Sequence, residues 1–164
     1  MFKVNDLVIY GSNGVCKIIA VGKLDGMSND KQYYTLEPYY AKASKYFLPV
    51  DNDKVVLRKI LSKDEANALI DDIKNIGVLW ISDERKRELD YKEAIKKCDP
   101  VELVKIIKTI YHRKEERLAV GKKITAGDEK YFNIAENSLY GELACSLDID
   151  KDEVKDYIIS KVNE

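Results

Sequence analysis

The chain has 164 residues, of which 45% are hydrophobic and 35% charged, and its formal net charge is −1. These values predict one or two small domains with a core and exclude a disordered chain. The sequence contains no run of about 18 apolar residues and opens on Met-Phe-Lys-Val-Asn-Asp, so we expect neither a membrane span nor a signal peptide. The expected location is cytoplasmic.

The first 60 residues are predicted to form strands. Short β-branched runs alternate with turn residues, and a strand is expected in each of five segments: 6–10, 15–21, 32–36, 46–50 and 55–58. Pro49 lacks the N–H that a strand ladder needs, so its strand is expected to lie at a sheet edge or to end there. Five short strands with turns at this spacing predict a small β-barrel or a strongly bent sheet.

From residue 62 the apolar spacing changes from two residues to about 3.6, which is typical of helices. Two start signals are strong: the capping box Ser62-Lys-Asp-Glu65 and the proline-containing first turn Asp99-Pro-Val-Glu102. Three further helices are expected to begin at Ser82, Thr125 and Asp150. The predicted fold class is therefore α+β, with a β domain over residues 1–60 and a bundle of about five helices over residues 61–164.

The small net charge hides a segmented pattern. Residues 85–123 contain thirteen Lys or Arg against seven Asp or Glu, whereas residues 61–84 and 124–164 are acidic. A basic segment between two acidic ones suggests a local anionic partner. A solvated helix face with mixed charges would give the same pattern, so charge alone leaves both interpretations open.

Catalytic and metal-binding motifs are absent from the sequence. The three cysteines, Cys16, Cys98 and Cys145, share no metal-ligand spacing and are expected to be reduced thiols. The single histidine, His112, lies in a predicted helix and is interpreted as structural. The sequence also lacks a phosphate-binding glycine loop and a nucleophile elbow. We therefore predict a protein that is not an enzyme and needs no cofactor or metal.

Trp80, the only tryptophan, precedes the basic cluster Arg85-Lys86-Arg87. An aromatic ring at a helix entrance beside cations is suited to stack on or wedge between bases while the cations hold phosphates. Packing between helices is the commoner fate of a tryptophan, and spacing alone favours that alternative. The DNA-binding candidates are Trp80, Arg85, Lys86 and Arg87.

The chain carries a series of short motifs in a characteristic order. They comprise residues 2–10, 14–18, 33–36 and 48–50, then Trp80 with residues 86–87, and finally residues 99–102, 125–130 and 139–144. In order and spacing they resemble the CarD/CdnL family of bacterial transcription regulators. The first part is also similar to the polymerase-interacting domain of transcription-repair coupling factors. The resemblance covers nearly the whole chain.

This resemblance implies a Tudor/SH3-like five-stranded barrel over residues 1–60 that binds the RNA polymerase β subunit through an exposed sheet edge. It implies that the helical domain contacts promoter DNA at the upstream edge of the transcription bubble, with Trp80 as a wedge in the minor groove. A wedge that binds melted or distorted DNA better than closed duplex stabilises the open complex by that difference in affinity.

Two departures from the family pattern concern the expected contacts. Leu24 and Phe47 stand where the family often has arginines, so this chain would use apolar contact or neighbouring lysines. The expected polymerase-binding residues are Lys23, Leu24, Tyr46, Phe47 and Leu48. About four extra residues, roughly one helical turn, separate Trp80 from Lys86.

The expected partners are the RNA polymerase β subunit and promoter DNA, with no membrane contact and a monomeric chain. The alternative is a protein-interaction adaptor whose helical domain never touches DNA. A salt titration of DNA binding, with and without polymerase, separates the two functions.

Overall fold

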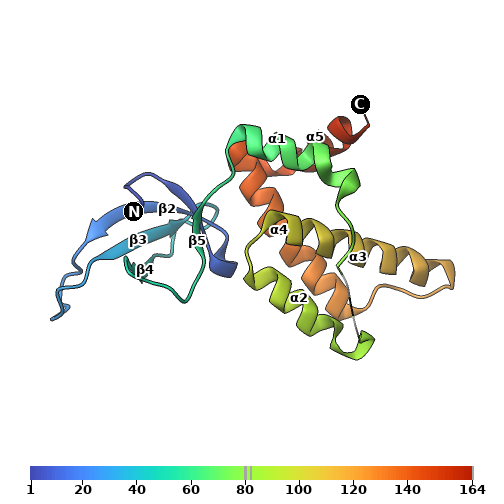
Figure 1. Ribbon diagram of the computed structural model, residues 1–164, viewed down its shortest axis with the longest axis horizontal. Helices are drawn as coiled ribbons and strands as arrows, with labels where there is room; N and C mark the ends of the chain where they lie inside the picture. The colour runs from blue at the N-terminus through green and yellow to red at the C-terminus, as the bar shows by residue number, and fades with distance from the viewer. Residues whose placement is uncertain (80, 82, 164) are drawn as a thin grey trace. The chain divides into compact units, whose positions relative to one another are not determined.

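The computed structural model describes residues 1–79, 81 and 83–163. It divides into two compact units, Met1–Ile60 and Leu61–Glu164, here called the sheet domain and the helical domain. Five antiparallel strands come first in the chain and five α-helices follow, which confirms the predicted α+β fold class (Figure 1).

The sheet domain is a single five-stranded sheet in the order β4-β3-β2-β1-β5, antiparallel throughout. Its strands are β1 (Leu7–Tyr10), β2 (Val15–Gly22), β3 (Tyr33–Pro38), β4 (Tyr46–Pro49) and β5 (Leu57–Lys59). As predicted from Pro49, β4 lies at an edge and ends at that proline. One face of the sheet forms a core of buried side chains: Val8, Cys16, Ile18, Tyr34, Leu36 and Leu48.

The last strand begins two residues later than the expected start at residue 55. The Asn52 side chain explains the shift, because its Nδ2 donates to the Val55 carbonyl over 2.7 Å and its Oδ1 accepts from the Val55 N–H over 3.3 Å. These bonds hold residues 52–55 in a turn. The strand ladder with β1 starts only at Leu57, which pairs with Tyr10.

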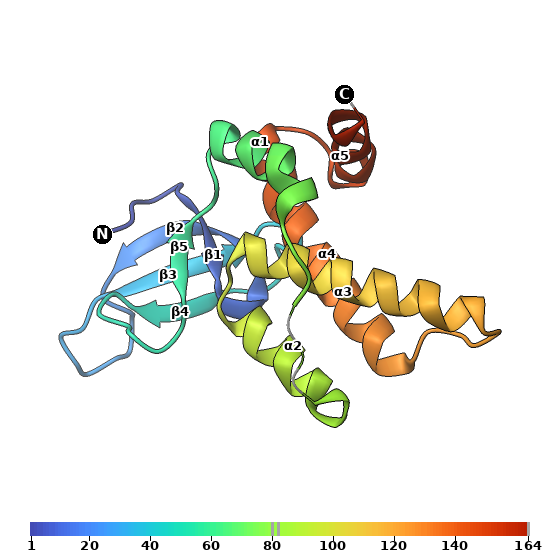
Figure 2. The ribbon, with the colours of Figure 1, turned by 45° about the vertical axis from the view of Figure 1, so that its right-hand side comes forward.

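The helical domain contains α1 (Lys63–Asp72), α2 (Arg87–Lys96), α3 (Pro100–Ala119), α4 (Ala126–Leu147) and α5 (Val154–Val162). Short 3₁₀ turns η2 (Ile73–Asn75), η3 (Glu84–Lys86) and η4 (Lys151–Glu153) follow or precede three of them, and η1 (Gly11–Asn13) lies in the sheet domain. Helix α4 packs against each of the other four helices (Figure 2). Its buried residues Ala135, Leu139 and Leu143 belong to the common core.

Local capping explains where three helices begin. Ser62 and Glu65 form the reciprocal capping box, with bonds of 3.1 and 3.0 Å. The Asp99 carboxylate accepts from the Val101 N–H over 2.9 Å, and the Thr125 hydroxyl accepts from the Asp128 N–H over 3.1 Å. Each bond satisfies an N–H that has no partner within the helix.

The starts of α2 and α5 differ from the prediction. The expected cap Ser82 lies outside the described residues, and the Asp83 carboxylate caps η3 by accepting from the Arg85 N–H over 3.0 Å. Asp150 makes no side-chain cap bond, and η4 separates it from the start of α5 at Val154.

None of the helices in the described ranges is long and apolar enough to cross a membrane.

Candidate functional site

A buried carboxylate organises the region that contains the basic cluster. Asp128, in the first turn of α4, is fully buried. Its Oδ1 accepts from Arg87 Nε over 2.9 Å and from the Tyr91 hydroxyl over 3.2 Å, and its Oδ2 accepts from Arg113 Nε over 3.0 Å. Arg87 and Tyr91 come from α2 and Arg113 from α3, so one side chain joins three helices.

The charged groups in this network stabilise one another's ionised forms. Burial alone would raise the pKa of Asp128, but hydrogen bonds from Arg87 and Arg113 outweigh it and hold the pKa below its usual value. Burial lowers the pKa of Arg113, and the bond and charge of Asp128 more than compensate and raise it. Burial also raises the pKa of the Tyr91 hydroxyl. Asp128 is therefore an anion between two cations.

Glu84 completes the network at the surface. Its Oε2 accepts from Arg113 Nη1 over 2.7 Å, and its main-chain carbonyl accepts from Arg87 Nη1 over 3.3 Å. Arg87 Nη2 also donates to the Thr125 hydroxyl over 3.3 Å. Both arginines are therefore bonded on more than one side, and the η3 turn is fixed to the start of α4.

This network bears on one expectation about the basic cluster. The Arg87 side chain is only 19% exposed and its guanidinium is bonded within the domain, so its expected role in DNA binding stays a prediction with less exposed surface behind it. The Arg85 side chain is 91% exposed, and Lys86 is also exposed. Arg85 makes one longer contact, 3.5 Å from its Nε to Asp83 Oδ1. The remaining DNA-binding candidate, Trp80, lies outside the described residues.

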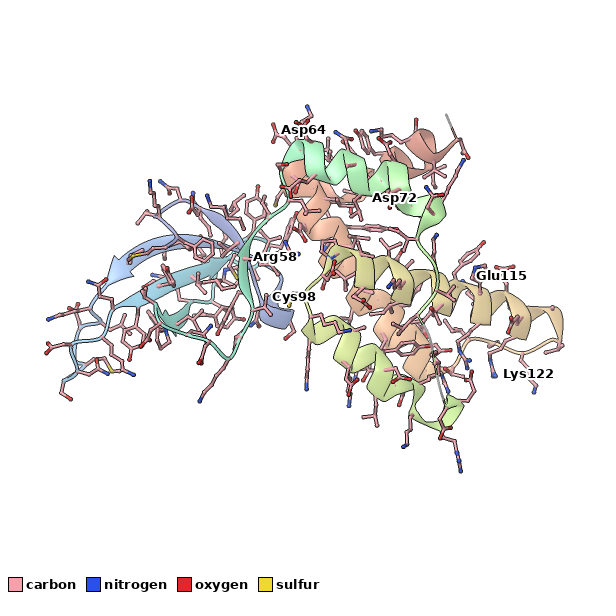
Figure 3. The ribbon with its side chains drawn as sticks, in the orientation of Figure 1. Arg58, Asp64, Asp72, Cys98, Glu115 and Lys122 are labelled. Atoms are coloured by element: carbon pink, nitrogen blue, oxygen red, sulfur yellow. The ribbon has the colours of Figure 1, made fainter. Side chains whose placement is uncertain are left out.

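The other cations of the basic segment fall into two groups. Four are engaged: Lys105 with Glu102, Lys108 with the carbonyls of Ile73 and Ile76, Arg113 with Asp128, and Arg117 with the Lys123 carbonyl. Six are exposed: Lys92, Lys96, Lys97, Lys114, Lys122 and Lys123. Figure 3 shows Lys122, with Glu115, projecting away from the bundle at the end of α3. Some of the cations of residues 85–123 are therefore engaged within the helical domain, and only the others are exposed to solvent.

The polymerase-binding candidates of β4 point to opposite faces of the sheet. Phe47 pairs with Thr35 and is 52% exposed, whereas Leu48 pairs with Tyr34 and is only 5% exposed. Side chains alternate along a strand, so neighbouring residues cannot both face outward. The Leu48 side chain therefore belongs to the core and only its main chain lies at the edge, so a polymerase contact at Leu48, which stays a prediction, would use main-chain groups.

The remaining candidates in the sheet domain lie toward opposite ends of the sheet. Tyr46 begins β4 opposite Leu36, whereas Lys23 and Leu24 follow Gly22, which pairs with Tyr33 near the end of β4. Tyr46 is half-buried, and its ring lies 5.5 Å from that of Tyr10. Lys23 is exposed, with a 3.1 Å ion pair to Asp30, and Leu24 is half-buried. Both follow the end of β2, two strands from β4, which corresponds to about 10 Å across the sheet.

Three observations concern metal binding and nucleophilic chemistry in the part of the chain that the structure describes. There, no three His, Cys, Asp or Glu side chains are placed to hold a metal ion. His112 is exposed on α3, and burial raises the pKa of the Cys16 thiol to about 11. Such a thiol is protonated at neutral pH and is a poor nucleophile.

Sequence reasoning missed Asp128, Arg113 and Tyr91 as members of a site. The only signal was the Thr125–Asp128 helix start, which predicted a cap but not burial. The partners of Asp128 lie 15 to 41 positions away in the chain. Only the packing of α2, α3 and α4 brings them together.

Comparison with known proteins gives two matches that follow each other along the chain. Residues 2–61 match the family model for the CarD-like/TRCF RID domain. Residues 81–159 match the model for the CarD C-terminal domain. No individual curated protein matches the sequence.

Proposed function

Because the chain belongs to the CarD family, whose members are RNA polymerase-interacting transcription regulators, we propose that it bridges the polymerase β subunit and promoter DNA and stabilises the open complex. In this proposal the sheet domain binds the β subunit. The helical domain contacts DNA at the upstream edge of the bubble, with Trp80 in the minor groove.

The observation that carries the DNA contact is the position of Arg85 and Lys86. Both are exposed on a 3₁₀ turn whose next residue, Arg87, is tied to buried Asp128. A fixed turn presents two cations without the loss of backbone freedom that a loose loop would incur on binding. Cations held in this way are suited to neutralise neighbouring phosphates.

Two features of β4 support the polymerase contact. It is an edge strand, so one side of its backbone is not paired with another strand in the described sheet. Beside that edge, Phe47 exposes a large apolar ring. A partner strand added to such an edge gains main-chain hydrogen bonds and covers the ring.

The proposal is tested by the lifetime of promoter open complexes. Wild-type protein is expected to lengthen it and to extend the polymerase footprint upstream. The double variant Arg85→Ala/Lys86→Ala should bind polymerase normally and lose most of this effect. The matched control is Lys96→Ala/Lys97→Ala, which removes two exposed adjacent cations from the other end of α2.

The alternative, an adaptor that does not touch DNA, predicts a different outcome. Both double variants would then behave as wild type in the open-complex assay. Polymerase binding would depend only on the sheet domain.

A further inference from the structure

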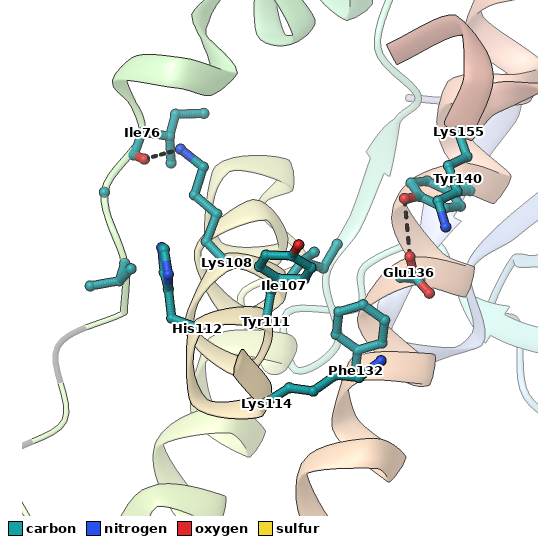
Figure 4. A pocket seen from close by; sticks show the side chains of 12 residues that line it. Ile76, Ile107, Lys108, Tyr111, His112, Lys114, Phe132, Glu136, Tyr140 and Lys155 are labelled. Carbon is teal, nitrogen blue, oxygen red and sulfur yellow. Dashed lines mark hydrogen bonds between the residues drawn. The ribbon is translucent and has the colours of Figure 1, made fainter. Parts of the chain in front are cut away.

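The helical domain has a hollow that the proposed function does not use. Its volume is about 700 Å³, and it lies between residues 76–78, α3, α4 and the start of α5 (Figure 4). This volume is in the range of sites that hold one small organic group. We call it the aromatic groove, defined by Tyr111, His112, Phe132 and Tyr140, with Lys114, Glu136 and Lys155.

Aromatic rings line the groove from two helices. Tyr111 of α3 is 53% exposed, and its ring meets that of His112 edge to face with centroids 6.3 Å apart. Phe132 and Tyr140 of α4 are half-buried. Two exposed and two half-buried rings gathered in one hollow are suited to stack on a flat aromatic group, such as a nucleic-acid base.

Two free ammonium groups flank these rings. Lys114 and Lys155 are exposed, and within the described ranges neither has an ion pair or hydrogen-bond partner. Figure 4 shows Lys155 on the side of Tyr140 and Lys114 on the side of Phe132. The two lysines come from different helices, α3 and α5, so the two cations are suited to bind two separate phosphates.

The wall beside residues 76–78 is held by a different lysine. Lys108 donates to the carbonyls of Ile73 and Ile76, so its ammonium group is engaged by the chain itself. The groove is thus bounded by a fixed main-chain segment.

One carboxylate lies between the two free cations. Glu136 is on α4 between Phe132 and Tyr140, and its Oε2 accepts from the Tyr140 hydroxyl over 3.1 Å. A carboxylate has about four acceptor positions, so this bond leaves capacity for a ligand donor. A negative centre with positive ends does not suit the continuous acidic face of a peptide. It suits a base with an amino group, flanked by its phosphates.

We propose that the aromatic groove binds a short unpaired nucleic-acid strand: a base stacks on Tyr111 and Phe132, its amino group donates to Glu136, and flanking phosphates meet Lys114 and Lys155. This inference rests on the proposed DNA contact of the helical domain and extends it from duplex to single strand.

The test is direct binding of fluorescent oligonucleotides about 12 nucleotides long to the full chain without polymerase. Oligo(dC) is expected to bind more tightly than oligo(dT), because cytosine offers an amino donor that thymine lacks. Glu136→Ala should remove this preference. Tyr111→Ala should weaken oligo(dC) binding about tenfold, equivalent to about 1.4 kcal/mol.

The cations are tested as a pair. Lys114→Gln/Lys155→Gln should flatten the log–log salt dependence of binding by about 1.4, because each contact to a single strand contributes about 0.7. The matched control is Lys122→Gln/Lys123→Gln, which removes the same charge from exposed residues outside the groove. Circular dichroism verifies that each variant is folded.

Three results would overturn the inference. If the groove pair and the control pair reduce oligonucleotide binding equally, the nucleic acid is attracted by the general positive charge of the surface and not by the groove. Unchanged oligonucleotide binding with lost polymerase binding would identify a protein site. Binding of free dCMP as tight as that of oligo(dC) would identify a mononucleotide site. None of these results depends on open-complex lifetime, so the inference and the proposed function can fail separately.

Discussion

Arg87 donates from Nε to Oδ1 of Asp128 over 2.9 Å, although the two residues are 41 positions apart in the chain. The arginine side chain is 19% exposed and the carboxylate fully buried, so this contact lies inside the helical domain. A basic cluster that looks uniform in sequence therefore has two roles. Arg85 and Lys86 face solvent, whereas Arg87 holds the turn that carries them.

Asp128→Asn should destabilise the helical domain strongly. It removes the anion but leaves Arg87 and Arg113 in place, and breaking a buried ion pair on one side typically costs about 3–5 kcal/mol. The measurement is urea unfolding followed by circular dichroism at a helix wavelength, because the α-helices lie only in this domain. Glu129→Gln is the control, since it makes the same chemical change at an exposed neighbour. Equal midpoints for the two variants would contradict the role of Asp128.

Lowering the pH should show how much the Asp128 carboxylate contributes to stability. The folded-state pKa of Asp128 is lowered, so its stabilising contribution is fully present above the unfolded value of about 3.9 and is lost as pH falls through the folded pKa. The melting temperature of wild-type protein should therefore fall more steeply below about pH 4 than that of Asp128→Asn. If the melting temperatures of the two proteins fall in parallel with pH in that range, the ionised Asp128 carboxylate does not contribute to stability.

Arg85→Ala/Lys86→Ala should weaken DNA binding about equally across sequences. If both cations touch phosphates of duplex DNA, the log–log salt slope should flatten by about 0.9 for each. Stability should stay within about 0.5 kcal/mol of wild type, because both side chains are exposed. Arg87→Ala should instead lower the free energy of unfolding, because the buried Asp128 carboxylate then loses one of its two arginine partners. An unchanged slope in the double variant would assign Arg85 and Lys86 to a solvated surface.

Phe47→Asp should break binding to the polymerase β subunit while the sheet domain stays folded, since Phe47 lies outside the core. Val56→Asp is the matched control, because it places the same charge on an exposed residue before the opposite edge strand. Leu48→Asp should instead unfold the sheet domain by burying a charge. Pull-down with the β subunit and thermal melting together give the answer. If the Phe47→Asp variant still binds the β subunit, the contact lies outside β4.

Trp80→Ala should shorten open-complex lifetime and leave β-subunit binding intact. Contact between a base and an aromatic ring is worth about 1–3 kcal/mol, and about 1.4 kcal/mol is a tenfold change in an equilibrium constant. The melting temperature should change little, because a wedge exposed for DNA fills no core cavity. The opposite result, a loss of about 3–5 kcal/mol in stability without a specific open-complex defect, would identify a core tryptophan.

Features set by neighbouring residues could be predicted from the sequence. The capping bonds of Ser62, Asp99 and Thr125 use donors two or three residues away, so their motifs determined the helix starts. The edge position of β4 followed from the missing N–H of Pro49. The fifth strand was misplaced because the Asn52 turn competes with β-branched Val55 and Val56.

The roles of single side chains depended on tertiary packing and were predicted less well. Phe47 and Leu48 are equally apolar, and only the register against Thr35 and Tyr34 shows which of them faces solvent. Likewise, nothing in the motif of residues 85–87 distinguishes the arginine that will meet Asp128. That distinction arises only when α2 packs against α4.

The edge strand β4 has a consequence for self-association. An exposed edge with a large apolar ring invites a second copy of the chain to pair with it and aggregate. In this protein the edge is only four residues long, is preceded by exposed Lys45 and ends at Pro49. A short strand, a flanking positive charge and a proline each oppose edge-to-edge pairing. These three features oppose pairing of the β4 edge with a second copy of the chain, and none of them removes the main-chain groups before Pro49 that the proposed polymerase contact would use.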